Sequence, residues 1–414
     1  MEVDFKNPYR PGAGHMPPHL AGREEQFREF DRLLEQDTIL ENLVLTGLRG
    51  VGKTVLLERF KPRAITEGWL WAGTDMSESA SVTEANLSMR LLADLSTITS
   101  VIEIGETKTL GMGFGSSTAV DATHLTYNVL AAIYEHTPGL VVDKLKAALE
   151  FAANQLQLAG HPRVIFAYDE AQNLADNADA DEFPLSVLLD VFQSIQKKGV
   201  PFMLVLTGLP TLFPKLVDAR TYSERMFRVV TLGRLDDDAS RDAIRKPVEA
   251  AQSPLQLSDE SVETICTQSG GYPYFIQFIC REVYDVFIQK LTADEQPSVP
   301  VEAIQRKLDS DFFAGRWGRA TDRQRDLLFV VANLESPEEE FSINDLVAKS
   351  KELVQSGVLE KAFSASHASQ MLVTLGEQGL IYKNRFGRYA FAVPLLSQFI
   401  LREFDRSLSE RPGF

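Results

Sequence analysis

The chain has 414 residues, which is too long for one ordinary hydrophobic core and predicts two or three domains. Apolar residues make up 44% and charged residues 24%, values typical of a globular protein in water. No run of 18 apolar residues occurs, and residues 1–10 lack the apolar segment of a signal peptide, so we expect neither membrane insertion nor export. Cys266 and Cys280 lack zinc-site spacing, and we interpret both as buried small hydrophobes of a cytoplasmic protein.

Charge is unevenly distributed along the chain. The sequence holds 42 basic and 58 acidic residues, a net charge of −16. Residues 315–414 contain 13 of each, so the whole acidic excess lies before residue 315. The first three quarters of the chain would therefore repel a phosphate backbone, whereas the C-terminal part would not.

The first half of the chain alternates between two kinds of apolar pattern. Residues 7–18 are rich in proline and glycine and predict an irregular N-terminal arm, which we bound at 1–20. Five short runs are mainly apolar and do not alternate with polar residues, which predicts strands covered on both faces. The predicted strands are 42–46, 68–72, 164–168, 202–206 and 227–231. Helical spacing falls at 23–34, 55–60, 82–95 and 141–158, and this alternation predicts a parallel α/β sheet.

Other segments predict the boundaries of further parts. Residues 96–123 are rich in glycine, serine and threonine and predict an insertion into the sheet domain. From 236 to 291 the pattern is helical only, 292–300 is a predicted linker, and 301–313 is a predicted helix. The expected division is a core at 21–235, a helical lid at 236–300, a linker helix at 301–319 and a small C-terminal domain at 320–414.

A glycine-rich loop follows the first predicted strand. Residues 47–54 match the pattern G-x-x-x-x-G-K-[ST], between a strand and a helix. Glycines let backbone amides wrap phosphate groups, and the following helix adds partial positive charge. Lys53 would meet the β- and γ-phosphates of ATP, and the Thr54 hydroxyl would bind Mg²⁺. The alternative is an ordinary glycine-rich turn. The predicted nucleotide contacts here are Gly47, Leu48, Arg49, Gly50, Val51, Gly52, Lys53, Thr54 and Val55.

Two carboxylates end the third predicted strand. The run 164–168 is followed by Asp169 and Glu170, at the sheet edge where α/β proteins bind ligands. We expect Asp169 to hold Mg²⁺, directly or through water, and Glu170 to polarise the water that attacks the γ-phosphate. The alternative is a pair of solvated acids at a strand end.

Two further residues are candidates for catalysis. Thr207 ends the fourth predicted strand. In P-loop ATPases whose catalytic glutamate follows the aspartate, this strand lies between the strand of the phosphate loop and the strand of the two acids. The Thr207 side chain would then point toward the attacking water. The alternative is a threonine that caps the next segment. Arg225 is a candidate arginine finger, acting within the chain or on a neighbour. Its alternative is a local ion pair, and Arg228 is a weaker rival.

Taken together, the ordered motifs resemble a known group of ATPases. Gly22-Arg23-Glu24, the loop 47–54, Asp169-Glu170-Ala171-Gln172, Thr207-Gly208-Leu209-Pro210 and Gly270-Gly271-Tyr272-Pro273 occur in that order. The sequence resembles AAA+ and STAND ATPases of the archaeal type, which neighbour the Orc1/Cdc6 initiators. Residues 169–225 are also similar to TnsC- and TniB-type transposition ATPases.

This resemblance implies a fold and further nucleotide contacts. It implies a P-loop NTPase of the ASCE type, with a five-stranded parallel sheet, a helical lid and a C-terminal winged helix. Gly22 and Arg23 would lie near the adenine, and Pro273 would close over the base from the lid. Typical lids carry an arginine at the start of a lid helix, whereas the nearest arginine here is Arg281, two turns further on. That departure favours the STAND-like form and slow turnover.

The last hundred residues have the pattern of a winged helix. Helical spacing at 322–334, 343–353 and 364–378 precedes a strand, turn and strand at 380–391. The helix 364–378 would enter the major groove of DNA with His367, Ser369 and Gln370 facing outward. The basic residues of the hairpin would meet phosphates. These are Lys383, Arg385 and Arg388. The alternative is a module that binds protein or packs on the lid.

The sequence therefore predicts an ATP-dependent molecular switch with ATPase activity. Its cofactors would be ATP and Mg²⁺. Nucleotide state would be coupled to assembly of a homo-oligomer and to double-stranded DNA or a protein partner, with no membrane involved. One alternative is a nucleotide-gated DNA-binding or signalling regulator with little turnover, and another is a scaffold in which ATP is structural. Replication, transposition, transcription control and phage defence all fit this pattern.

Overall fold

The computed structural model describes residues 6–12, 14–77, 79–102, 124–253, 255–292, 298–385 and 387–409. The chain divides into two compact units. The sheet unit consists of Glu24–Gly47 and Lys53–Thr231. The helical unit consists of Met1–Arg23, Leu48–Gly52 and Leu232–Phe414. Among the residues described, no helix combines the length and apolar character needed to cross a bilayer.

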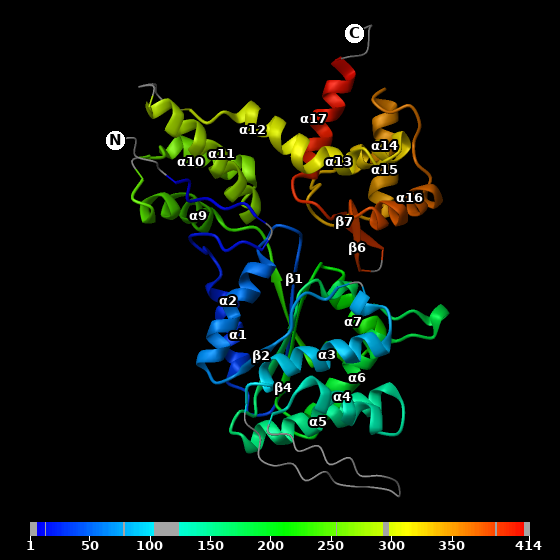
Figure 1. Cartoon of the computed structure of the whole chain (residues 1–414). Coiled ribbons are helices and arrows are strands. Elements are labelled where there is room, and N and C mark those ends of the chain that lie inside the picture. Colours follow the sequence, from blue (N-terminus) through cyan, green and yellow to red (C-terminus); the bar gives the residue numbers. More distant parts are fainter. Residues whose placement is uncertain are drawn as a thin grey trace, which may run out of the picture. The chain divides into compact units, whose positions relative to one another are not determined.

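The sheet unit is built on a five-stranded parallel sheet in the order β2-β3-β4-β1-β5, flanked by helices (Figure 1). Its strands are β1 Asn42–Gly47, β2 Leu70–Ala72, β3 Val164–Tyr168, β4 Phe202–Gly208 and β5 Phe227–Leu232. Every residue of β1, β3 and β4 is buried, as predicted. The same prediction is wrong for the edge strand β5, which exposes Arg228, Val229 and Thr231. Strand β4 lies between β1 and β3, so the ends of the three central strands meet at one edge, as the sequence predicted.

The helices of the sheet unit include several that the sequence patterns did not reveal. They are α1 Glu24–Leu34, α2 Lys53–Thr66, α3 Glu84–Thr99, α4 Tyr127–His136, α5 Val141–Leu158, α6 Pro184–Lys197, α7 Leu212–Ala219 and α8 Ser223–Met226. Short 3₁₀ turns lie at Ser79–Ser81, Ala171–Asn173 and Ala178–Ala180. Of the insertion predicted at 96–123, residues 96–99 instead complete α3, because Leu95 and Thr99 continue its buried face. Residues 103–123 lie outside the described part.

A buried amide bracket joins β1 to β4 and α6. The Asn42 Oδ1 atom accepts hydrogen bonds from the Leu204 backbone N–H at 2.7 Å and from Gln196 Nε2 at 2.8 Å. Gln196 also donates to the Phe202 carbonyl at 2.7 Å. Both amide side chains are buried, so their polar atoms would destabilise the core if they lacked partners. The bracket fixes the register of the strand that leads into the phosphate loop, residues 47–54.

The helical unit contains the predicted lid helices and the C-terminal region. Its helices are α9 Asp237–Ala250, α10 Asp259–Ser269, α11 Pro273–Thr292, α12 Val301–Leu308, α13 Ala314–Trp317, α14 Asp322–Ala332, α15 Ile343–Gln355, α16 Ala365–Glu377 and α17 Leu396–Ser409. A two-stranded antiparallel hairpin is formed by β6 Ile381–Arg385 and β7 Arg388–Phe391. The helix predicted over 301–313 is not uniform, because α12 ends at Leu308 and a π-helical turn, Asp309–Phe313, follows it.

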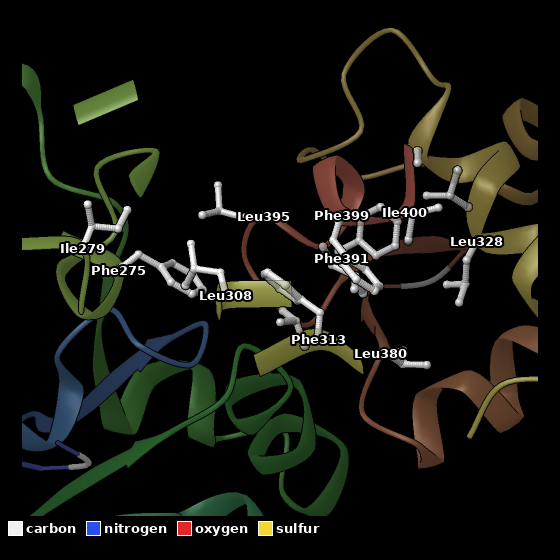
Figure 2. Packing of buried hydrophobic residues seen from close by; sticks show 14 of the residues in the cluster. Phe275, Ile279, Leu308, Phe313, Leu328, Leu380, Phe391, Leu395, Phe399 and Ile400 are labelled. Carbon is white, nitrogen blue, oxygen red and sulfur yellow. The ribbon is translucent and has the colours of Figure 1, made fainter. Parts of the chain in front are cut away.

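One hydrophobic core runs through the helical unit. Phe275 of α11 lies 6.2 Å from Phe313, and Phe313 stacks on Phe399 of α17 at 5.1 Å, measured between ring centroids (Figure 2). Arg402 of α17 also donates to the buried Asp309 carboxylate at 2.5 Å. Helix α11, the turn 309–313 and the last helix, α17, are therefore packed together. The expected boundary at residue 320 stays a prediction.

Candidate active site

The phosphate loop begins where β1 ends. Gly50 and Gly52 adopt φ angles of +81° and +91°, a left-handed region that glycine enters without strain. Helix α2 begins at Lys53, whose amine donates to the Gly47 carbonyl at 2.9 Å, and this lysine is only 8% exposed. Leu48 and Val55 on either side are half-buried. The Lys53 side chain therefore joins the last turn of the loop to its first residue, Gly47.

Asp169 lies at the centre of the candidate site in the sheet unit. One carboxylate oxygen accepts from the Thr54 hydroxyl at 2.5 Å. The other accepts from the Thr207 hydroxyl and from the Glu170 backbone N–H, the latter at 2.8 Å. Asp169 is 4% exposed and Thr207 is fully buried. The phosphate loop, the end of β3 and the end of β4, which are far apart in the sequence, therefore meet at one carboxylate. We call these contacts the Asp169 centre.

The donor set of the Asp169 centre suits a hard cation. A carboxylate and a hydroxyl oxygen are the ligands that Mg²⁺ takes from proteins when substrate phosphates and water complete its shell. Among the residues described, no cluster of three histidine, cysteine, aspartate or glutamate side chains forms a metal cage made by protein alone. Thr54 and Asp169 fit a metal that arrives with a nucleotide.

Glu170 is held beside Asp169 in an unusual backbone conformation. Its φ angle is +52°, and its carboxylate accepts a hydrogen bond from Gln172 Nε2. The Gln172 side-chain oxygen accepts from the Leu209 backbone N–H at 3.1 Å, just after β4. A Cβ atom at Gly208 would stand 2.6 Å from that same oxygen, so glycine leaves room for it. Gln172 therefore links Glu170 to the end of β4.

Lys215 of α7 holds the backbone of Gln172 in place. Its amine donates to the Gln172 backbone carbonyl at 2.7 Å, and burial lowers the pKa of this amine. The sequence patterns gave no role to Gln172 or Lys215. Gln172 follows the Asp-Glu pair by two residues, and a polar residue at that place is the one signal that pointed to it.

Within the helical unit, two backbone carbonyls of the phosphate loop accept hydrogen bonds. Arg23 is 5% exposed, and its guanidinium donates to the Val51 carbonyl at 2.9 Å and to the Gly233 carbonyl at 3.0 Å. The Tyr274 N–H donates to the Gly50 carbonyl at 3.0 Å. Gly22 precedes Arg23 with a φ of +63°, and Pro273 is the first residue of α11. The carbonyls of Gly50 and Val51 are thus held by the start of α11 and by Arg23.

Comparison with known proteins agrees with this geometry. Residues 19–210 match the family model described as AAA ATPase domain. This part of the chain is therefore similar to AAA ATPase domains. Residues 310–400 match a second family model, described as a domain of unknown function. Among curated proteins, none is significantly similar to this chain in sequence.

Two solved structures share the fold of this chain over nearly its whole length. The Walker-type ATPase PABY2304 of Pyrococcus abyssi is 16% identical, with a TM-score of 0.55, and the match covers 92% of this chain and 96% of that one. The ADP form of the Orc2 protein of Aeropyrum pernix is 14% identical, with a TM-score of 0.53, covering 97% of this chain and 98% of that one. The fold is that of a P-loop ATPase, as in these two proteins.

The two candidate arginine fingers, Arg225 and Arg228, differ in their contacts. Arg228 pairs with Glu29 at 2.6 Å, so it is already engaged. Arg225 is exposed on α8, and among the described residues it has no ion-pair partner. The segment before it is braced, because Asp190 accepts from Arg220 at 2.7 Å and from the Tyr222 hydroxyl at 2.7 Å. Burial raises the pKa of Asp190, but these two donors outweigh it and the net shift is downward.

The expected nucleic-acid contacts lie on α16 and the β6–β7 hairpin. His367 and Gln370 are exposed on α16, while Ser369 is half-buried. Lys383 and Arg388 are both exposed, and Arg388 lies 3.7 Å from the Asp345 carboxylate. The side chain of Arg385 lies outside the described part. Nearby, Asn384 of the same hairpin donates to Glu340, so acids accompany the basic residues there.

Proposed function

We propose that the protein binds ATP with Mg²⁺ at the phosphate loop and hydrolyses it to ADP and phosphate. The Asp169 centre carries this proposal, because it gathers the loop threonine, the strand-end acids and the strand-end hydroxyl around one carboxylate. The matched AAA ATPase domain over 19–210 supports the same activity. The name of the Aeropyrum pernix relative records an ADP form of that protein.

The proposed roles follow from position and chemistry. Backbone amides of residues 47–54 and the Lys53 ammonium would hold the phosphates. Thr54 and Asp169 would hold Mg²⁺, which would neutralise the charge that develops on the phosphates. Glu170 would accept a proton from the attacking water, and Thr207 would help to place that water. Arg225 would stabilise the transition state on a neighbouring copy, since it is exposed and unpaired among the residues described.

The lid favours a second candidate function, a switch that binds ATP and turns it over slowly. Arg281 is an exposed residue of α11, two turns beyond Pro273, and the start of the helix carries no arginine. We propose that nucleotide state acts on the C-terminal region, which we interpret as a winged helix, through the core shared by α11, the turn 309–313 and α17. The partner of that region would be double-stranded DNA or a protein.

Steady-state phosphate release separates the candidates. Wild-type protein should release phosphate with Mg²⁺ and not with a chelator, and Lys53→Ala should abolish the signal. Stimulation by duplex DNA would support a nucleic-acid partner. Tight ATP binding without release would leave the slow switch, and no binding would remove both functions.

A further inference from the structure

Strand β5 forms one edge of the five-stranded sheet, and its free side is open within the sheet unit. Strand β1 lies on its other side, and among the described residues of the sheet unit no further segment forms backbone hydrogen bonds with it. Its exposed residues include Thr231 and Val229, the latter 37% exposed. The backbone N–H and C=O groups along such an edge can pair with an added strand.

This edge lacks features that usually prevent pairing with another chain. Edge strands are commonly protected by proline or by charged side chains. The segment Phe227–Leu232 contains no proline and a single charged residue, Arg228, whose guanidinium is bonded to Glu29 of α1 at 2.6 Å. Residues 229–231 are all β-branched, a composition that favours strand pairing. Strand β5 is therefore suited to accept a further strand.

An open groove of about 510 Å³ follows this edge. The five consecutive residues 227–231 all line it. Since neighbouring side chains of a strand point to opposite faces, a groove lined by all five runs along the edge and not over one face. The other lining residues are Glu25, Gln26 and Glu29 of α1 and Glu41, which precedes β1. All of them belong to the sheet unit, so the groove is defined within one compact unit.

The rim of the groove is acidic. Of its three glutamates, only Glu29 is engaged, by Arg228 among others. Glu25 and Glu41 form no ion pair among the residues described. In the same part of the chain, the buried Gln26 Oε1 atom has no hydrogen-bond donor. These groups would accept from a positively charged segment that is rich in donors, and they would repel nucleic acid.

We propose that β5 binds an extended, basic segment of a partner protein, which adds to the sheet as a further strand and directs lysine or arginine side chains toward Glu25 and Glu41. Backbone hydrogen bonds would provide affinity, and the alternate basic side chains would provide specificity. A second copy of this chain is a poorer occupant, because it would bring its own acidic rim to the groove. No residue of the phosphate loop lines the groove, so this binding does not require a nucleotide.

Fluorescence anisotropy with a labelled peptide that alternates lysine with valine over the length of β5 tests this surface. Wild-type protein should bind this lysine peptide at low salt, and should bind a peptide that alternates glutamate with valine at least about tenfold more weakly. Methylation of every backbone nitrogen keeps the charge of the lysine peptide but removes its donors, and should also weaken binding at least about tenfold. Hydrogen exchange of residues 227–232 should slow when the lysine peptide is bound.

Variants of the rim separate this groove from general attraction to an acidic protein. Glu25→Gln combined with Glu41→Gln should weaken binding of the lysine peptide several-fold, the weight of two exposed charge pairs. Glu58→Gln combined with Glu67→Gln is the matched control, because it removes the same charge from exposed positions outside the groove. Equal weakening in the two double variants would overturn the proposal.

Three further results would also overturn it. The first is the absence of binding of the lysine peptide at low salt. The second is equal binding of the methylated and unmethylated peptides, because a strand added to β5 depends on its backbone donors. The third is protection of residues 227–232 that rises with protein concentration in the absence of peptide, which would make a second copy the occupant.

Discussion

The Asp169 centre and the β6–β7 hairpin were both expected to meet phosphate-bearing ligands, and their charges are held in different ways. Asp169 is buried and accepts three hydrogen bonds from residues of three separate motifs. On the hairpin, Arg388 is exposed and stands near Asp345, and Asn384 is bonded to Glu340. A buried charge with fixed donors has a defined geometry, whereas an exposed ion pair contributes little and rearranges easily. Substitutions should therefore have large effects in the first region and small ones in the second.

The largest effect is expected at Lys53. Lys53→Ala should abolish ATP binding, because no other amine is placed on the phosphate loop to meet the β- and γ-phosphates. Calorimetry gives the affinity, and circular dichroism checks that the fold is intact. Lys61→Ala, an exposed lysine of the same helix, is the control and should bind normally. Undiminished affinity in Lys53→Ala would contradict the site.

Glu170→Gln should preserve ATP binding and lower kcat at least about a hundredfold, the usual weight of a positioned acid or base. The substitution keeps size and hydrogen-bonding capacity but removes the proton acceptor. Glu58→Gln, at an exposed position on α2, should turn over like wild type. Parent-level turnover in Glu170→Gln would make Glu170 a structural residue.

Arg225→Ala should weaken ATP-dependent oligomers and slow turnover at least about tenfold, since an arginine finger stabilises the transition-state charge. Light scattering and phosphate release measure the two effects. Arg228→Ala removes only the ion pair with Glu29 and should change neither. A monomer with and without ATP, together with unchanged turnover in Arg225→Ala, would exclude action on a neighbour.

Gln172→Ala should lower kcat several-fold while the affinity for ATP stays unchanged, because only the orientation of Glu170 is lost. A purely structural role would instead lower the melting temperature and leave kcat per folded molecule unaltered. Gln157→Ala, an exposed glutamine of α5, is the control. An unchanged or higher kcat in Gln172→Ala would show that the hydrogen bond does not position Glu170 for catalysis.

The smallest effect is expected at the hairpin. If Lys383, Arg385 and Arg388 each met a DNA phosphate, the log–log salt slope from these contacts would be about −3. Removing all three together should lower this slope and weaken binding similarly across DNA sequences, because phosphate contacts position the protein without reading sequence. Changes at His367 or Gln370 should alter sequence preference instead. Fluorescence anisotropy that detects no binding at low salt, with or without ATP, would leave protein docking as the role of this region.

The central strands and the phosphate loop were predictable because their physical requirements are local. A strand buried on both faces must be apolar at every position, and the loop must place glycine where φ is positive, as at Gly50 and Gly52. Helix α17 could also have been predicted, since Leu396, Phe399 and Ile400 recur at helical spacing.

Other features depend on contacts that no local pattern reveals. Gln172 reaches Glu170 because residue 170 turns into the left-handed region, which a glutamate rarely adopts. Phe312 and Tyr274 are far apart in the sequence, yet their ring centroids lie 5.5 Å apart. The π-helical turn at Asp309–Phe313 interrupts a pattern that looked like one continuous helix. In each case the decisive partner is distant in the chain.

The most direct test of the account is the Mg²⁺ dependence of ATP binding in Asp169→Asn. Asparagine can still accept from Thr207 and from the Glu170 N–H, so the centre should keep its shape while losing the charge that holds the cation. Calorimetry in Mg²⁺ and in a chelator should show that wild-type protein binds ATP more tightly with Mg²⁺ and that this advantage disappears in the variant. An equal Mg²⁺ advantage in both proteins would contradict the assignment of Asp169 as the residue around which the site is built.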